Sequence, residues 1–147
     1  MRRAAQILAT LFYVGHAPFV PASFGAGAAL LIYWFLLPES PVFEPLVAAA
    51  LVALAVLSSG VAEARYGRDG KQIVIDEVAG MFVSLLLLPR SSVVFLAAFV
   101  AFRVLDVLKP FPAGRAQRLP GGWGVVADDI FAGLYTNIFI RLVLLLG

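Results

Sequence analysis

The chain contains no cysteine and only one histidine, His16, among its 147 residues. Without cysteine there can be no disulfide, no thiolate metal site and no cysteine nucleophile. A single histidine excludes a metal site built from several histidines and a phosphoryl-transfer route that needs a second catalytic histidine. Any metal or acid–base chemistry therefore has to depend mainly on carboxylates and cationic side chains.

Charge is also scarce. Only 14% of the residues are charged and 62% are hydrophobic, whereas a soluble domain averages about 25% and 45–50%. The formal net charge is only +2, and the bases are scattered among acids, so nothing favours a nucleic-acid partner. The length suits one domain. We therefore expect a single membrane-embedded domain over residues 1–147.

Apolar runs divide the chain into helical segments. Five such runs occupy residues 24–37, 46–62, 73–88, 93–108 and 125–146. They predict an all-α membrane bundle of four to five hydrophobic helices. All of the runs except 125–146 are shorter than the roughly 20 residues that span a bilayer. We therefore expect acidic helix ends to enter the interface, or the bilayer to thin locally.

Two N-terminal segments precede this pattern. Residues 4–14 are apolar and are predicted to form a helix that lies on the membrane or enters it. Residues 15–27 read GHAPFVPASFGAG, and prolines and glycines at this density indicate a loop or a broken helix start. Ser23 is a candidate N-cap for the helix that follows.

The distribution of bases predicts an orientation, because cytoplasmic loops are enriched in lysine and arginine. A cytoplasmic N-terminus and five spans place two further basic loops in the cytoplasm, and the loop with Glu39 and Glu44 outside. Arg90 is the one departure from this pattern. The bases assigned to the cytoplasmic side are Arg2, Arg3, Arg65, Arg68, Lys71, Lys109, Arg115 and Arg118.

This topology brings four polar stretches to one membrane face. They are the loop 15–27, the pair Asp76 and Glu77, the group Arg103, Asp106 and Lys109, and the pair Asp128 and Asp129. Ionisable groups at the edge of apolar spans are costly and are a functional hypothesis by default. We therefore expect a site at the cytoplasmic face.

Acids dominate this expected site. Five carboxylates at one depth repel each other unless a cation neutralises them, and Mg²⁺ prefers carboxylate and water oxygens. The candidate metal ligands are Asp76, Glu77, Asp106, Asp128 and Asp129. Adjacent acids on a helix point about 100° apart, so we expect one of each adjacent pair to bind metal and the other to cap a helix or hold a base.

Bases beside these acids suggest an anionic substrate. Arg103 and Lys109 lie three residues on either side of Asp106, near one helix face. Arginine binds phosphate bidentately and lysine adds a point charge, so a phosphate ester is the expected substrate. A carboxylate would act as general base or as nucleophile, and the sequence does not choose between these roles.

Simpler explanations exist for the same residues. Asp128 and Asp129 could be helix N-caps, Arg103 and Asp106 a structural ion pair, and the loop bases a contact with anionic lipids. A small ion-coupled carrier or cation channel is the alternative function, although such sites lie near the middle of the membrane. A small homo-oligomer is compatible with the chain but nothing in the sequence requires one.

Three motifs resemble the phosphatidylglycerophosphatase A family. Residues 15–27 are similar to G-x-x-P-x-x-P-G-T-x-G-S, with Ala22, Ser23 and Ala26 at the usual Gly, Thr and Ser positions. Residues 75–80, IDEVAG, are similar to I-D-E-x-x-G. The longest match runs from Phe102 to Gly133 and contains F-R-x-x-D-x-x-K-P-x-P, G-G-x-G and D-D-x-x-A-G.

The resemblance implies a Mg²⁺-dependent lipid phosphatase. Such an enzyme would hydrolyse phosphatidylglycerophosphate to phosphatidylglycerol and inorganic phosphate at the cytoplasmic leaflet of a bacterial inner membrane. On this basis the expected catalytic residues are Asp76, Glu77, Asp106 and Asp129. The expected phosphate-binding residues are Arg103, Lys109 and Ser23.

Overall fold

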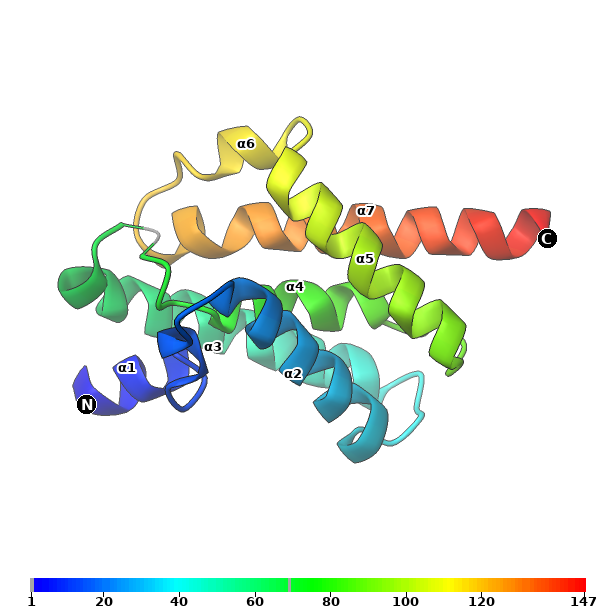
Figure 1. Cartoon of the computed structure of the whole chain (residues 1–147), viewed down its shortest axis with the longest axis horizontal. Coiled ribbons are helices and arrows are strands. Elements are labelled where there is room, and N and C mark those ends of the chain that lie inside the picture. The colour runs from blue at the N-terminus through cyan, green and yellow to red at the C-terminus, as the bar shows by residue number, and fades with distance from the viewer. Residues whose placement is uncertain (1, 69) are drawn as a thin grey trace.

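Helices make up the fold. The computed structural model describes residues 2–68 and 70–147, and the elements assigned within these ranges are all helical (Figure 1). They are α1 (Arg2–Ala9), the 3-10 helix η1 (Val14–His16), α2 (Pro21–Leu36), α3 (Phe43–Tyr66), α4 (Ile75–Leu85), α5 (Ser92–Leu108), α6 (Ala113–Ala116) and α7 (Gly122–Leu146). The predicted all-α class is confirmed, and each of the five apolar runs forms a helix.

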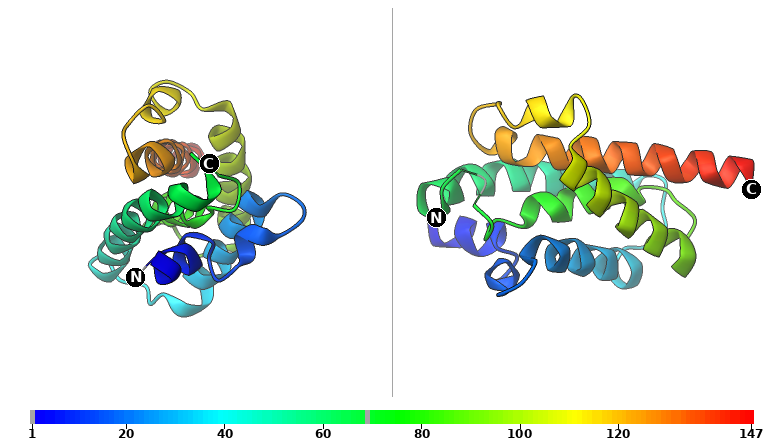
Figure 2. Two further views of the ribbon diagram at one scale, coloured as in Figure 1. Left: turned by 90° about the vertical axis from the view of Figure 1, so that its left-hand side faces the viewer. Right: turned by 45° about the horizontal axis from the view of Figure 1, so that its top comes forward.

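Helix α4 lies at the centre of the bundle. Every one of its residues is buried, and it contacts α2, α3, α5 and α7 (Figure 2). Its 11 residues extend about 16 Å, roughly half of a hydrocarbon core of about 30 Å. Because its neighbours enclose it, α4 can be short and apolar on all sides. Because α4 is enclosed by protein, the short third run does not itself have to match the thickness of the bilayer.

Two helices are long and apolar enough to cross a membrane. They are α3, with 24 residues, and α7, with 25; α2 is apolar but shorter. The C-terminal end of α7 extends beyond the rest of the bundle (Figure 1), where Leu145 and Leu146 are exposed. An apolar end of this kind is expected to contact lipid.

The connecting segments separate into two ends of the bundle. The N-terminus, the segment between α3 and α4, and the segment around α6 lie at one end, called here the site end (Figure 1). The short connections 37–42 and 86–91 lie at the other end, called the far end, as does the C-terminus. This grouping is the same as the one predicted from the loop charges.

Glycines let α4 and α7 approach closely. A Cβ on Gly80 would lie 2.7 Å from the carbonyl oxygen of Asp129 and 2.8 Å from the ring of Phe102. A Cβ on Gly133 would lie 2.5 Å from the carbonyl oxygen of Gly80. Small residues at helix contacts in membranes permit this spacing. Gly80 lies one turn after Asp76, and Gly133 one turn after Asp129, so the contact fixes the separation of the acids.

A buried ionic network holds the far end together. The Glu44 carboxylate accepts hydrogen bonds from the Tyr33 hydroxyl (2.6 Å), the Leu87 backbone N–H (3.0 Å) and Arg90 (3.3 Å). Arg90 also pairs with Glu39 at 3.5 Å. The charge of Arg90 is therefore matched by two acids, which explains its departure from the loop-charge pattern.

Two differences in helix starts concern candidate site residues. The prediction that Ser23 is an N-cap is wrong, because α2 begins at Pro21 and Ser23 lies within its first turn. Proline favours the first helical position because its fixed φ suits a helix. Helix α7 begins at Gly122, three residues before the predicted start. Asp128 and Asp129 therefore lie in its second turn and are not N-caps.

The first segment also differs. Residues 4–14 were expected to form one helix, but α1 ends at Ala9. Leu11, Phe12 and Tyr13 follow with positive φ angles of 46°, 51° and 73°. Such angles are uncommon for residues other than glycine, and they turn the chain away from the α1 axis.

Replacing Gly80 by Ala should destabilise the bundle by about 1–3 kcal/mol, because the added methyl group overpacks the α4–α7 contact. Gly27→Ala is the matched control, since a Cβ there has no atom within 4 Å, and it should be neutral or slightly stabilising. Denaturant unfolding in detergent measures both. Equal stability of the two variants would contradict the close packing at Gly80.

Replacing Glu44 by Ala should lower the free energy of unfolding by about 3 kcal/mol, since it leaves the partly buried Arg90 without its main partner. Glu39→Ala should cost less than about 1 kcal/mol, because the Glu39 side chain is 72% exposed. The same unfolding measurement tests both. A similar loss in the two variants would show that the network does not depend on Glu44.

Candidate functional site

Three helices bring the predicted acids together at the site end. Asp76 and Glu77 lie in the first turn of α4, where the helix dipole favours negative charge. Asp128 and Asp129 come from the second turn of α7, and Asp106 from the last turn of α5. The two helices with paired acids are the two that the glycine contact holds together.

The carboxylates form two groups that share one residue. Asp76, Glu77 and Asp129 each offer an oxygen, and these oxygens lie within 4.8 Å of one another. Asp106, Asp128 and Asp129 form a second group by the same measure. Both adjacent acids, Asp76 and Glu77, offer an oxygen to the first group. Glutamate carries one more methylene than aspartate, which lets it reach round the helix. The expectation that one of them binds metal while the other caps a helix or holds a base stays a prediction.

The shared position is deeply buried. Asp129 is 3% exposed and Glu77 9%. The Oδ2 atom of Asp129 and the Oε2 atom of Glu77 have no hydrogen-bond partner among the described residues. Burying a charged oxygen without a partner costs free energy. A hard divalent cation, which takes carboxylate oxygens as ligands, fits this donor set.

Two cationic side chains border the acids. Arg103 forms an ion pair with Asp106 through Nη1, and Lys109 forms one with Asp128 through Nζ. Asp128 thus holds a base, as expected for one member of its pair, while it also belongs to the second acidic group. Five acids and two bases give the cluster a net charge of minus three when all are ionised.

Gln117 is a site residue that the sequence analysis missed. Its side-chain Nε2 donates to the Oδ2 atom of Asp128 at 2.9 Å. Arg68 holds the backbone of the same segment by donating to the carbonyl oxygens of Gln117 (2.8 Å) and Leu119 (3.3 Å). A single amide in a loop carries no spacing that marks it, so no signal in the sequence indicated this contact.

Two further bases near the site, Arg115 and Arg118, are not in any of the ion pairs found among the described residues. The guanidinium of Arg115 lies 5.2 Å from the centre of the Phe111 ring, and Arg118 is exposed. Their role as topology signals remains a prediction.

Residues 15–27 pack against the segment that precedes α4. A Cβ on Gly15 would clash with the carbonyl of Gln72, and one on Gly25 would lie 2.9 Å from the Val74 Cβ. The Val74 N–H also donates to the Ala9 carbonyl at 2.9 Å. These contacts position the segment that leads into Asp76. Ser23 is not in either acidic group, but it lines a cavity together with Arg103.

Comparison with known proteins gives the family. The sequence profile described as phosphatidylglycerophosphatase A matches residues 7–144. The chain belongs to the phosphatidylglycerophosphatase A family. This membership confirms the resemblance drawn from the three motifs, and it makes the protein a phosphatase. The protein has two apolar helices long enough to cross a membrane, and its family acts on a phospholipid. Together these findings indicate a membrane protein.

Individual relatives of this family cover most of the chain. A protein of Bacteroides thetaiotaomicron named putative phosphatidylinositol-3-phosphatase is 33% identical over 144 residues, covering 91% of this chain and 89% of its own. The phosphatidylglycerophosphatase A of Escherichia coli is 36% identical over 133 residues, with 88% and 77% covered. That of Haemophilus influenzae is 40% identical over 74 residues, with 49% and 45% covered. No solved structure matches the chain.

Because Asp129 belongs to both groups, Asp129→Asn should abolish most of the stabilisation that a divalent cation gives the purified protein. Bound ligand raises the melting temperature by mass action, so thermal unfolding in detergent with and without Mg²⁺ measures the effect. The control is Glu39→Gln, at the exposed far end, which should keep the full shift. A full shift in the Asp129→Asn protein would mean that the ion binds elsewhere.

Proposed function

We propose that the protein hydrolyses phosphatidylglycerophosphate to phosphatidylglycerol and inorganic phosphate, with Mg²⁺ bound at the acid cluster. The observation that carries this proposal is the position of Asp129. It belongs to both groups of carboxylates, and two cations pair with the other acids of the second group. Family membership supports the choice of substrate.

Electrostatics supports the need for a metal ion. A phosphate monoester carries a charge of about −1.5 to −2 at neutral pH, and the cluster itself is anionic. The residues that would hold Mg²⁺ are those of the two acidic groups, which share Asp129. The first group is Asp76, Glu77 and Asp129, and the second is Asp106, Asp128 and Asp129. When bound, Mg²⁺ would neutralise the acids, polarise the phosphoryl oxygens and lower the pKa of an attacking water.

The chain's own bases would hold the phosphate. A guanidinium has five N–H donors, so the ion pair of Arg103 with Asp106 leaves donors for phosphate oxygens. Lys109 adds a positive charge on the Asp128 side of the cluster. Ser23 lines the same cavity as Arg103, and its hydroxyl would donate at the edge of the site.

A carboxylate of the cluster would take part in the proton transfer. In the direct route, a water oxygen bonds to phosphorus as a carboxylate accepts the water's proton. The ester P–O bond then breaks, and the proton passes to the departing alcohol oxygen. In the other route a carboxylate oxygen bonds to phosphorus as the ester P–O bond breaks, and a protonated carboxyl of the cluster gives its proton to the departing alcohol oxygen. Water then hydrolyses the acyl phosphate, which releases inorganic phosphate and returns the proton to the cluster. We assign these roles to the set Asp76, Glu77, Asp106 and Asp129.

The site end would face the cytoplasm of a bacterial inner membrane. The helices α2, α3, α4, α5 and α7 would form the multi-pass domain over residues 1–147, with α4 enclosed by the others. Nine of the eleven basic residues gather at the site end, which the positive-inside rule assigns to the cytoplasm. The other two are Arg90 and Arg141. Arg141 donates to the carbonyl oxygens of Leu86 and Leu87 at the far end. The far end carries Glu39 and Glu44, with Arg90 neutralised by both.

Phosphate release from phosphatidylglycerophosphate should require Mg²⁺. Chelation by EDTA should reduce the rate at least about 100-fold, since a metal ion contributes several kcal/mol of charge stabilisation, and added Mg²⁺ should restore it. The assay uses the purified protein in detergent and measures inorganic phosphate. Undiminished release in EDTA would contradict the metal proposal.

A second substrate controls for the headgroup. The Bacteroides relative is named for phosphatidylinositol 3-phosphate, so that lipid is tested in parallel. Faster hydrolysis of it would overturn the headgroup assignment, and release from neither lipid would overturn the proposed activity.

A further inference from the structure

An apolar groove runs between α2 and α5 and passes Arg103, one of the two bases that border the acids. It consists of two adjoining cavities of about 440 and 520 Å³, which share Ser23 and Phe99 as walls. We call it the α2–α5 groove. It exists because α2 packs far more extensively against α4 than against α5, so the two outer helices leave a space between them.

Polar groups are confined to one position of this groove. Among the described residues that line it, only Ser23 and Arg103 have polar side chains. Arg103 is the partner of Asp106, which belongs to the second acidic group. The apolar groove is therefore continuous with the proposed phosphate position.

The dimensions suit a lipid chain. With the phosphate at Arg103, the part of the groove left for a chain follows α5 back to Leu96, a rise of about 10 Å. This is about two-thirds of one leaflet of a hydrocarbon core of about 30 Å. Its two cavities fall within the roughly 300–1,000 Å³ of ordinary ligand sites.

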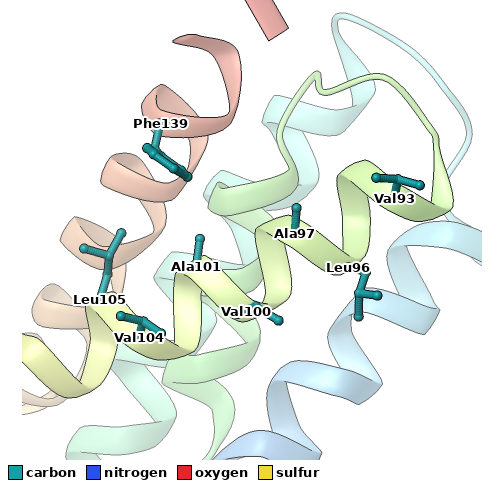
Figure 3. Close-up of a pocket in the computed structure, with 8 residues that line it drawn as sticks. All are labelled: Val93, Leu96, Ala97, Val100, Ala101, Val104, Leu105 and Phe139. Carbon is teal, nitrogen blue, oxygen red and sulfur yellow. The ribbon is translucent and has the colours of Figure 1, made fainter. Parts of the chain in front are cut away.

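A second groove on the other side of α5 provides a contrast. It has a volume of about 670 Å³ and is lined by α5 residues, among them Ala97 and Ala101, and by Phe139 of α7 (Figure 3). All of its described lining residues are apolar. This α5–α7 groove is larger than either cavity of the α2–α5 groove taken alone, but it lacks a polar residue to orient a headgroup.

We propose that the α2–α5 groove binds one acyl chain of the glycerophospholipid substrate. The substrate then reaches the acid cluster sideways from the bilayer, with its phosphate at Arg103 and its chain between α2 and α5. This inference rests on the proposed lipid phosphatase activity.

Gly27→Trp tests the groove without disturbing the backbone. Gly27 lines the groove, and a Cβ there meets no atom within 4 Å, so an indole can fill the space. The value of kcat/KM for diacyl phosphatidylglycerophosphate should fall about tenfold or more as contact with the chain is lost. The value for the deacylated substrate, glycerophosphoglycerophosphate, should not change. Ala97→Trp, in the α5–α7 groove, should leave both values unchanged.

Three results would overturn the proposal. They are an equal fall for both substrates in Gly27→Trp, no fall for either, or a selective fall for the diacyl substrate in Ala97→Trp alone. An inactive wild-type protein would instead overturn the phosphatase activity. In that case crosslinking tests the groove separately. A photoactivatable diacyl phosphatidylglycerophosphate, added at low molar ratio, should label residues of the α2–α5 groove. The Gly27→Trp substitution should abolish this labelling. Labelling of the α5–α7 groove alone would overturn the proposal.

Discussion

The contact between α4 and α7 determines the rest of the structure. Gly80 and Gly133 allow the two backbones to approach until a methyl group would no longer fit. Both helices begin at the site end and carry their acid pairs near that end. The two segments, separated by about fifty residues of sequence, therefore supply oxygens to one site. Without the close approach, Asp129 could not belong to a group with Asp76 and Glu77.

This arrangement concentrates negative charge in a buried place, which opposes folding. The far end compensates with a network in which Glu44 bonds three partners from α2 and from the segment after α4. Active sites often carry such unfavourable interactions while the rest of the fold supplies stability. Here the acids and the stabilising network lie at opposite ends of the bundle, so each can change with little direct contact between them.

Much of the architecture was predictable from the sequence. Apolar runs indicate which segments form the hydrophobic helices, and loop charges indicate which connections lie at the same end of the bundle. All five hydrophobic helices and the grouping of the acids at one end follow from them. Helix starts were less predictable: Pro21 and Gly122 begin α2 and α7 earlier than hydrophobicity indicated, since a helix can begin in polar or glycine-rich sequence. Gln117 escaped prediction because its contact depends on a loop path that tertiary packing decides. The roles of the individual acids stay predictions.

The enclosure of α4 has a consequence for how the protein responds to its membrane. A helix that touches lipid must tilt or shift when the bilayer changes thickness. Helix α4 is surrounded by protein, and α7 is locked against it by the glycine contact. The positions of the acids on these two helices are therefore fixed by the α4–α7 contact and not by the thickness of the bilayer. Changes in lipid composition would move the outer helices first, and the spacing of the carboxylates would be the last feature to change.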